Sequence, residues 1–449
     1  MKKNKHIYYS NSKGFYLPVI LMVTTIFMAL VTALISLSMA NLKIAELNNK
    51  KVAAMSISEA GINYYLWHLA HNDADYCDGG VCVGDAPFGP FTHDFTNQAG
   101  ESIGNYDLYI TPPSVDRQVV TVKSIGRVNG KSPTKTIVAE LAIPSFTKYT
   151  LLSSSEQLWV GSGEKINGSV HVNNNGLYNE GEIVGEATST EAEYTSWNWG
   201  AQPGVAGPGL FDDGKMFPVP PVDLNQISVD INGLKTLSSE NGKYIESSGS
   251  KGYHIVLKGN NFDLYKVSKF DNTNLTITTQ ASIGNYSYPS NGIIFVSDNL
   301  WIDGNINDTK ITVIAADPTA NQNQMKRIVI PDKITYSDYD GSDKIGLISQ
   351  TDILLTKNVP TEMEIDAAMI AKNGQIRIDN FGQIKNKIRV YGSMAHNGGL
   401  LWSYGATSNN ITSGYRLTET DMDPYNILNP PPEFPKTGTY SVLSWREEE

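Results

Sequence analysis

A long apolar segment lies close to the N-terminus of the chain. No charged side chain occurs from Gly14 to Leu42. About 20 apolar residues in a helix cross a bilayer core of about 30 Å, so the segment from Phe15 to Met39 is long enough to span a membrane with some tilt. The segment is longer than the apolar part of an ordinary secretory signal, and no clear small-residue cleavage motif follows it. The sequence therefore predicts one membrane-spanning helix that anchors the rest of the chain.

The residues before the apolar segment are basic. They include Lys2, Lys3, Lys5 and Lys13 and contain no acidic side chain. An excess of lysine on one flank of a membrane helix places that flank in the cytoplasm. We therefore expect a single-pass protein of the inner (cytoplasmic) membrane with an extracytoplasmic C-terminal domain.

The helix is predicted to continue beyond the membrane to residue 71. Between Asn41 and Ala70 the only glycine or proline is Gly61, and residues that favour helices dominate. A helix over residues 15–71 would be about 80 Å long. Its outer half carries an apolar stripe at heptad spacing. The residues of this stripe are Val52, Met55, Ile62, Leu66 and Leu69.

The composition limits the classes of function. The 449 residues suffice for an anchor and two or more folded parts. The net charge of -11 argues against a nucleic-acid partner, which needs clustered Lys and Arg. The two cysteines, Cys77 and Cys82, are close in sequence, and in an exported protein we expect them to form a disulfide.

An acidic loop follows the predicted helix at residues 72–85. Calcium prefers carboxylate oxygens in such loops, but the spacing does not match an EF-hand. The weak calcium candidates are Asp73, Asp75, Asp78 and Asp85. A zinc site formed by His68, His71 and Cys77 is an alternative. A solvated loop closed by the disulfide is simpler, so we expect no metal and no other cofactor.

Two β regions are predicted after this loop. Strands over 106–111, 118–128 and 136–143 would form a small antiparallel sheet within residues 72–148, with the helix packed on it. From residue 149 to 423, short β-branched runs alternate with Gly and Asn turns, which predicts a right-handed parallel β-helix-like domain. A β-sandwich is the alternative. The fold class is therefore α+β.

Two segments of the second region are expected to lie outside the coils. Residues 186–223 contain Trp199 and several prolines, and we interpret them as a long insertion across the coils. Residues 424–449 begin with a Pro-rich stretch, which fixes an extended path over the surface. We expect Trp445 to hold this tail on the last coil. No helix is expected within the β region.

The N-terminus resembles that of type IV prepilins. In that family a basic leader ends in Gly, and a dedicated prepilin peptidase cuts before Phe, as Lys13-Gly14-Phe15 would allow. Cleavage between Gly14 and Phe15 would remove a leader of residues 1–14. It would also place Pro18 in the first turn of the helix, where its missing N–H is not needed. The alternative is an uncleaved anchor.

The resemblance is more specific to PilX-like minor pilins. Major pilins carry Glu at the fifth mature position, where this chain has Val19, and PilX-like proteins often lack that acid. The segment Ser58-Glu59-Ala60-Gly61-Ile62 and the Pro-rich ending of the chain are similar to PilX-like sequences as well. The resemblance implies a non-enzymatic subunit of a type IV pilus or related filament system. Its partners would be the membrane, other pilin-like subunits, the assembly machinery and the prepilin peptidase.

Two other functions remain open from the sequence. The chain could be an uncleaved surface protein whose β-helix binds glycans through exposed Trp and Tyr side chains. It could also cleave polysaccharides, but no nucleophile, base and orienting group emerge together, and the sequence contains no G-x-S-x-G, H-E-x-x-H or P-loop motif. We therefore expect no catalytic residues.

Overall fold

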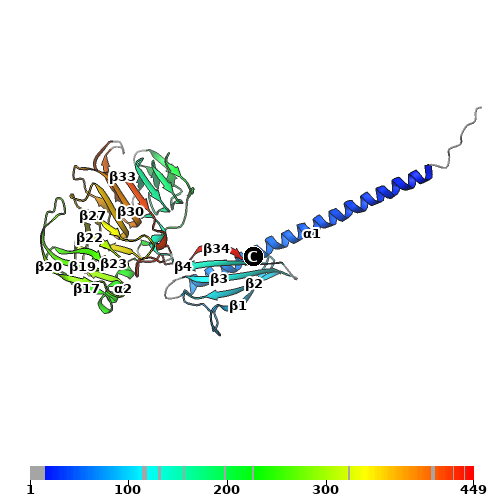
Figure 1. Ribbon diagram of the computed structural model, residues 1–449, viewed down its shortest axis with the longest axis horizontal. Helices are drawn as coiled ribbons and strands as arrows, with labels where there is room; N and C mark the ends of the chain where they lie inside the picture. The colour runs from blue at the N-terminus through cyan, green and yellow to red at the C-terminus, as the bar shows by residue number, and fades with distance from the viewer. Residues whose placement is uncertain are drawn as a thin grey trace, which may run out of the picture. The chain divides into compact units, whose positions relative to one another are not determined.

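The computed structural model describes residues 16–448, with gaps at 114–118, 130–132, 155–156, 197–198, 225–226, 322–323, 406–409, 428 and 439, and backbone alone at 227–230. The chain divides into two compact units (Figure 1). Unit 1 comprises Met1–Pro113, Val120–Leu141 and Val442–Glu449, and unit 2 comprises Ser114–Val119 and Ala142–Ser441. A long apolar helix, a small antiparallel sheet and a large domain of parallel strands confirm the predicted α+β class.

Unit 1 is one helix packed on one five-stranded sheet. The elements are α1 (Tyr16–His71), β1 (Phe88–Thr96), β2 (Ser102–Thr111), β3 (Val120–Val128), β4 (Thr134–Ala142) and β34 (Ser441–Glu448). The strand order is β1-β2-β3-β4-β34, and β1 to β4 pair antiparallel. Burial alternates along β3, because one face of the sheet lies under the helix and the other faces water.

The final strand, β34, was not predicted. We expected Trp445 to hold a surface tail on the last coil, but it lies on β34 at the edge of the unit 1 sheet and is 58% exposed. The Pro-rich residues before this strand do follow the surface of unit 2. There Phe434 is buried, and Thr312 donates a hydrogen bond to the carbonyl of Pro432.

Unit 2 consists of stacked coils whose strands form three walls. On the first wall, parallel pairing runs through ten strands. In spatial order they are β17 (Lys243–Ile245), β21 (Ile293–Val296), β23 (Lys310–Ala315), β26 (Lys344–Ser349), β28 (Glu362–Ala371), β30 (Ile384–His396), β5 (Leu151–Ser153), β8 (Val170–Val172), β11 (Ala187–Ser189) and β16 (Lys215–Met216).

The second wall contains the early parts of β28 and β30, since both strands bend from this wall to the first. Gly392 lies at the bend of β30 with φ +145, where a Cβ atom would meet the carbonyl of Ala367 at 2.2 Å. The other strands of this wall are β18 (Gly252–Gly259), β22 (Leu300–Ile306), β25 (Ile334–Tyr336), β33 (Ile411–Asp421), β7 (Glu164–Asn167), β10 (Glu182–Val184) and β15 (Leu210–Phe211).

The third wall forms two separate ladders. One contains β24 (Ile328–Ile330), β27 (Ile353–Leu355), β29 (Ile376–Ile378) and β31 (Leu400–Leu401), and the other contains β6 (Leu158–Val160), β9 (Leu177–Asn179) and β14 (Val205–Ala206). Among the described residues, no strand pairing joins β31 to β6. The third wall is therefore interrupted where the other two are continuous.

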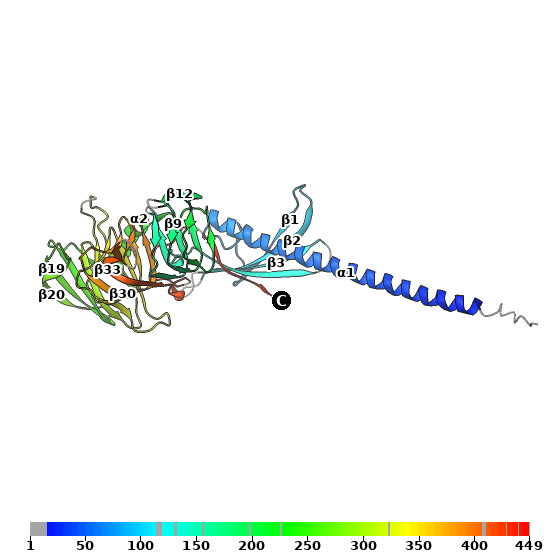
Figure 2. The same cartoon turned by 90° about the horizontal axis from the view of Figure 1, so that it is seen from above.

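The order of the coils in space differs from their order in the sequence. The first coil of the chain (β5, β6, β7) stacks on the last coil (β30, β31, β33), because β5 pairs with β30 and β7 pairs with β33. From β16 the chain passes through α2 (Ile227–Glu240) to β17, which begins the stack at the other end. Figure 2 shows β9 and β12 (Glu193–Ser196) at one end of unit 2 and β19 (Asn261–Phe270) and β20 (Ile277–Ser287) at the other.

The interior of unit 2 is a stack of aliphatic side chains. Residues in register on the first wall are buried one above the other, across the junction of the last and first coils. One such column is Ile294, Val313, Leu347, Met369, Met394, Leu151, Val170 and Ala187. The outward side of the same wall is also apolar, and Leu234 of α2 and Phe434 pack against it.

Two predictions about the β region were wrong. Residues 186–223 are not an insertion, because β11, β14, β15 and β16 stack on the preceding coil in parallel pairs. The hairpin of β12 and β13 (Gly200–Pro203) leaves that coil. We expected no helix in this region, but α2 is a helix. The antiparallel excursion of β18, β19 and β20 was also not foreseen.

Candidate functional site

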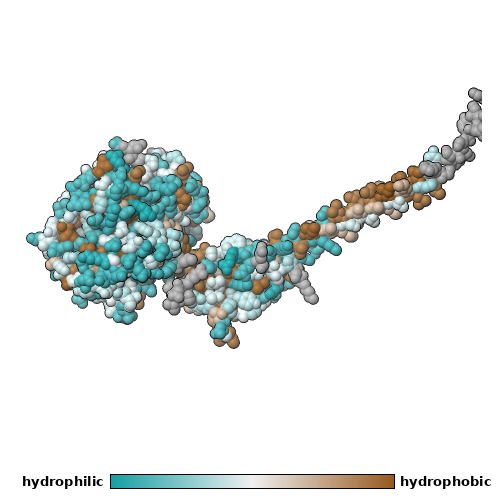
Figure 3. Space-filling model, viewed as in Figure 1, coloured by the Kyte–Doolittle hydropathy of each residue, from teal (hydrophilic) through white to brown (hydrophobic). Residues whose placement is uncertain are grey.

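The first half of α1 is an exposed apolar rod. Residues 16–49 are all exposed, and residues 16–42 carry no charge. These 27 residues would extend about 40 Å at 1.5 Å per residue, which exceeds a bilayer core of about 30 Å. The helix is long and apolar enough to cross a membrane. Figure 3 shows hydrophobic residues gathered along this half of the helix, beyond the sheet of unit 1.

The second half of α1 lies on the sheet with small residues at the contact. The buried helix positions recur every three or four residues, as one face of a helix requires. They are Ala54, Ile57, Ser58, Gly61, Ile62, Tyr65 and Leu69. The predicted stripe was partly wrong, because Val52 is exposed while Ile62 and Leu69 are buried. The true contact face uses Ala, Ser and Gly, which a search for large apolar residues overlooks.

Glycines on both elements allow the close approach of helix and sheet. A Cβ atom on Gly126 of β3 would lie 2.3 Å from the carbonyl oxygen of Ala54 and 2.5 Å from the amide nitrogen of Ser58. A Cβ atom on Gly61 of α1 would lie 2.3 Å from Oγ of Ser124. The hydroxyl of Ser58 donates to the carbonyl of Ser124 at 2.7 Å in this buried contact. The backbones are therefore too close for any side chain at Gly126.

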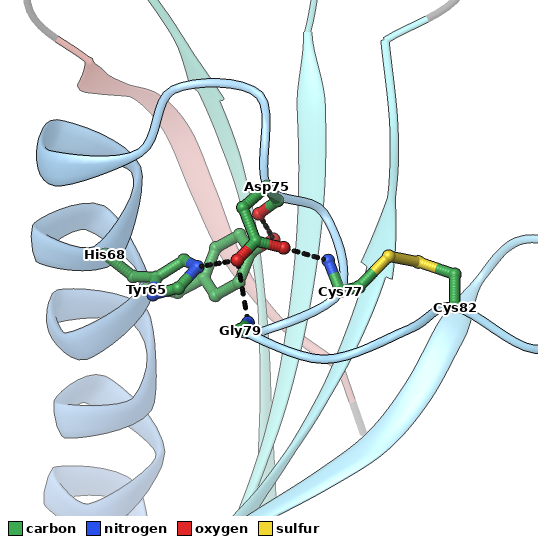
Figure 4. Close-up of a disulfide and its surroundings, with 6 residues drawn as sticks. All are labelled: Tyr65, His68, Asp75, Cys77, Gly79 and Cys82. Carbon is green, nitrogen blue, oxygen red and sulfur yellow. Dashed lines mark hydrogen bonds and ion pairs between the residues drawn. A yellow bond between two sulfur atoms is a disulfide. The ribbon is translucent and has the colours of Figure 1, made fainter.

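The loop after α1 is organised around Asp75 (Figure 4). A disulfide joins Cys77 to Cys82 with 5.1 Å between their Cα atoms. The backbone N–H groups of Cys77 and Gly79 donate to the Asp75 carboxylate at 2.8 and 2.7 Å, and Nε2 of His68 donates to it at 3.1 Å. Asp75 therefore ties the disulfide loop to the last turns of α1.

Burial alone would raise the pKa of Asp75. The hydrogen bonds from Cys77 and Gly79 and the charge of His68 outweigh it and hold the pKa below the ordinary value of 3.8. The contribution of Asp75 to stability is therefore complete above the pKa of an unfolded aspartate and is lost as the pH falls through the lower pKa of the folded side chain.

A second carboxylate joins the same loop to the sheet. Asp78 accepts hydrogen bonds from Nε2 of His93 on β1 at 2.6 Å and from the hydroxyl of Tyr64 on α1 at 3.0 Å. Burial, and then the Asp78 carboxylate, raise the pKa of Tyr64 to about 12. Asp75 and Asp78 thus fasten the loop to the helix and to the sheet.

Carboxylates of the acidic loop accept hydrogen bonds from donors of the protein itself. Asp75 and Asp78 accept hydrogen bonds from the chain itself, and Cys77 is in a disulfide and cannot ligate zinc. Within the part of the chain that the structure describes, no group of three or more His, Cys, Asp or Glu side chains could hold a metal ion. Asp85 is exposed. Gly14 and Phe15 lie outside the described residues.

We expect Asp75→Asn to loosen the disulfide loop. The asparagine amide would place N–H donors where a carboxylate now accepts from three donors, at a cost of about 1–3 kcal/mol. The Cys77–Cys82 bond should then be reduced faster by dithiothreitol, measured by mass after alkylation of the freed thiols. Asp85→Asn makes the same change on an exposed side chain of the same loop and should leave the rate unchanged. Equal rates in all three proteins would contradict the role given to Asp75.

Comparisons with known proteins add little. No protein-family model matches the chain, and no curated protein matches it. Among solved structures, the chain is similar to the competence-associated pilin ComZ from Thermus thermophilus, with a TM-score of 0.32 and 13% sequence identity. The match covers 89% of this chain and 97% of that one. At this TM-score the similarity carries no argument, so a function has to be inferred from the chain's own residues.

Proposed function

We propose that this chain is a non-enzymatic, membrane-inserted subunit of a type IV pilus or related filament system, of the PilX-like minor pilin class. The observation that carries the proposal is the fully exposed first half of α1, residues 16–49, in which residues 16–42 carry no charge. On the insertion scale, each Leu, Ile, Phe or Val near the centre of a membrane helix contributes about 0.3–0.6 kcal/mol, so insertion of this segment is worth several kcal/mol. A helix with this surface requires lipid or other apolar helices around it.

The same half of α1 suits two successive environments. In the membrane it spans the bilayer with its basic flank in the cytoplasm. In a filament it packs among the corresponding helices of other pilin-like subunits, which bury the same surface. The second half of the helix is fixed to the sheet of unit 1, so the β coils of unit 2 are carried outside for adhesion, initiation or modulation of the filament. The assembly machinery and the prepilin peptidase are the other partners, and the acidic chain binds no nucleic acid.

The start of α1 supports removal of the leader. A chain that began at Phe15 would have Pro18 in the first turn of its helix, where no backbone donor is needed. Val19 stands where a major pilin has Glu, which favours a minor subunit over the repeating subunit of the shaft.

The second candidate function is that of an uncleaved surface protein whose β-helix binds glycans. It is favoured by an aromatic-lined cavity in unit 2, between its first and last coils. The two functions differ at the N-terminus, because a filament subunit must lose residues 1–14 and a simple anchor keeps them. Intact-mass measurement of the protein extracted from membranes separates the two.

We expect Gly14→Leu to block leader removal. Glycine lets an extended backbone enter a crowded protease site, and a branched side chain at that position prevents it. The intact mass of the variant should correspond to a chain beginning at Met1, whereas the wild-type chain begins at Phe15. Ser12→Leu adds the same side chain two residues upstream and should be processed normally. Normal processing of Gly14→Leu would count against the prepilin assignment.

A further inference from the structure

The interruption of the third wall creates a cavity. The last and first coils of unit 2 are joined on two walls, where Met394 pairs with Leu151 and Thr418 pairs with Glu164. On the third wall β31 and β6 do not pair among the described residues. A cavity of about 350 Å³ lies at this position, lined by residues of both coils. Its volume is at the lower end of the range of about 300–1,000 Å³ that is typical of small-molecule sites.

Aromatic side chains form much of the cavity wall. Trp159, Trp402, Tyr404 and Tyr415 all line it. Trp402 and Tyr415 are buried, and the Tyr415 hydroxyl donates to the carbonyl of Pro360 at 2.9 Å. Trp159 differs from them because it is 40% exposed. The cavity is therefore lined by buried aromatic side chains and by one large aromatic side chain that is open to solvent.

Trp159 belongs to an aromatic cluster at the rim. Its ring packs edge-on against Trp199 at 5.7 Å between centroids, and Trp199 stacks on Tyr178 at 3.8 Å. This cluster holds the exposed indole in place, so little side-chain freedom is lost when a ligand stacks on it. Exposed aromatic side chains held in this way are typical of binding surfaces.

The Glu164 carboxyl group in the cavity wall has hydrogen-bonding capacity to spare. It accepts from the backbone N–H of Gly161 at 3.0 Å. Burial raises its pKa to about 7 and outweighs the hydrogen bonds from Gly161 and Thr418, which lower it. A carboxylate offers about four lone-pair positions, so these two bonds leave room for a further donor.

His396, which also lines the cavity, has a buried ring nitrogen without a partner in the described part of the chain. The side chain is fully buried, and burial lowers its pKa to about 3, so its ring is neutral. Its Nδ1 accepts from the N–H of Gly399 at 3.0 Å, which puts the ring proton on Nε2. That Nε2 has no hydrogen-bond partner among the described residues.

The residues that line the cavity favour one class of ligand over others. A purely apolar ligand would remove water from the Glu164 carboxyl group without giving it a new hydrogen-bond partner, which is costly. An anion would meet the carboxyl groups of Glu164 and Glu180, and among the described lining residues Arg416 is the one basic side chain that offsets them. A neutral ring with one C–H face and several hydroxyl groups can pack on the aromatic side chains of the cavity and form hydrogen bonds with its polar side chains.

We propose that this cavity binds a neutral saccharide unit of a surface glycan. The ring face stacks on the indole of Trp159, and a hydroxyl group donates to the Glu164 carboxyl group. The site exists in unit 2 itself, so the proposal does not depend on filament assembly, and it holds for a cleaved or an uncleaved N-terminus.

The test uses the full-length chain in detergent micelles. The probes are neutral oligosaccharides of glucose, galactose, mannose, rhamnose and N-acetylglucosamine, each titrated while tryptophan fluorescence and the heat of binding are recorded. We expect at least one of them to bind and to change the fluorescence of the wild-type chain. Trp159→Ala should weaken this binding at least about tenfold, and Glu164→Gln at least about fivefold.

Two comparisons keep the result interpretable. Trp445→Ala removes an exposed tryptophan from β34 of unit 1 and should bind as the wild type does. Glu164→Gln preserves the shape of the side chain, so it tests the carboxyl group even if Trp159→Ala were misfolded, as judged by near-ultraviolet circular dichroism. Three outcomes would overturn the proposal: no neutral saccharide binds at millimolar concentration, only a charged or apolar probe binds, or both cavity variants bind with wild-type affinity.

Discussion

Replacing both Ile26 and Leu30 with lysine is expected to release the protein from the membrane. These two side chains are one turn apart in the uncharged part of α1 and are exposed. A lysine at the centre of a membrane helix costs about 2.5–3.5 kcal/mol, and the lost apolar residues each contributed a few tenths of a kcal/mol. The double variant should therefore lose about 6–8 kcal/mol of insertion free energy. The measurement is the share of the protein in the membrane pellet after carbonate extraction.

The chain offers a matched control for this experiment. Asn48 and Val52 have the same spacing on the same helix and are also exposed, but they lie beyond the uncharged segment. The double variant Asn48→Lys and Val52→Lys adds the same charge and should remain in the pellet. If the Ile26 and Leu30 variant remained there to the same extent, the apolar half of α1 would not be the anchor.

A single methyl group at Gly126 is expected to detach α1 from its sheet. The Cβ atom of Gly126→Ala would lie 2.3 Å from a backbone oxygen of the helix, so backbone must move, since no flexible side chain is there to yield. Overpacking of this kind costs about 1–3 kcal/mol and sometimes more, and we expect the upper end because both partners are main chain. Hydrogen exchange at the amides of residues 54–69 should become about 100-fold faster, which corresponds to about 2.7 kcal/mol.

The control for the glycine experiment is Gly233→Ala. This glycine lies in α2, and a Cβ atom there would meet nothing within 4 Å. Alanine is better than glycine in a helix by up to about 1 kcal/mol, so α2 should become slightly more stable and exchange in α1 should not change. Wild-type exchange rates in Gly126→Ala would show that helix and sheet are farther apart than the structure places them.

The repeating parts of this fold were predictable from sequence, because strand identity depends on local patterns. Runs such as Ile293–Val296 and Ile353–Leu355 are β-branched or aliphatic and are bounded by polar turns, and both are strands of the coils. The apolar half of α1 was equally clear, since an uncharged segment of that length has few other uses.

The remaining features depend on contacts between residues that are distant in sequence. β34 pairs with a sheet formed by strands near the start of the chain, and nothing local marks it as an edge strand. Residues 186–223 were misread because their coil strands are only two or three residues long, too short to show a pattern between the prolines. The contact face of α1 was predicted incorrectly because Gly61 and Gly126 lie at the contact, and a search for hydrophobic side chains does not detect glycines.

The cavity in unit 2 was beyond sequence reasoning for the same reason. Trp159 and Trp402 are far apart in the sequence and lie on coils that are adjacent only because the chain stacks its first coil on its last. Exposed aromatic side chains were expected as a glycan platform, but nothing in the sequence places Glu164 and His396 beside them.

The most direct measurement of the central claim is the intact mass of this chain recovered from filaments sheared off intact cells. We expect the protein to be present in the sheared fraction together with other pilin-like subunits, with a mass that corresponds to a chain beginning at Phe15. Recovery from the membrane alone, with residues 1–14 still attached, would contradict it.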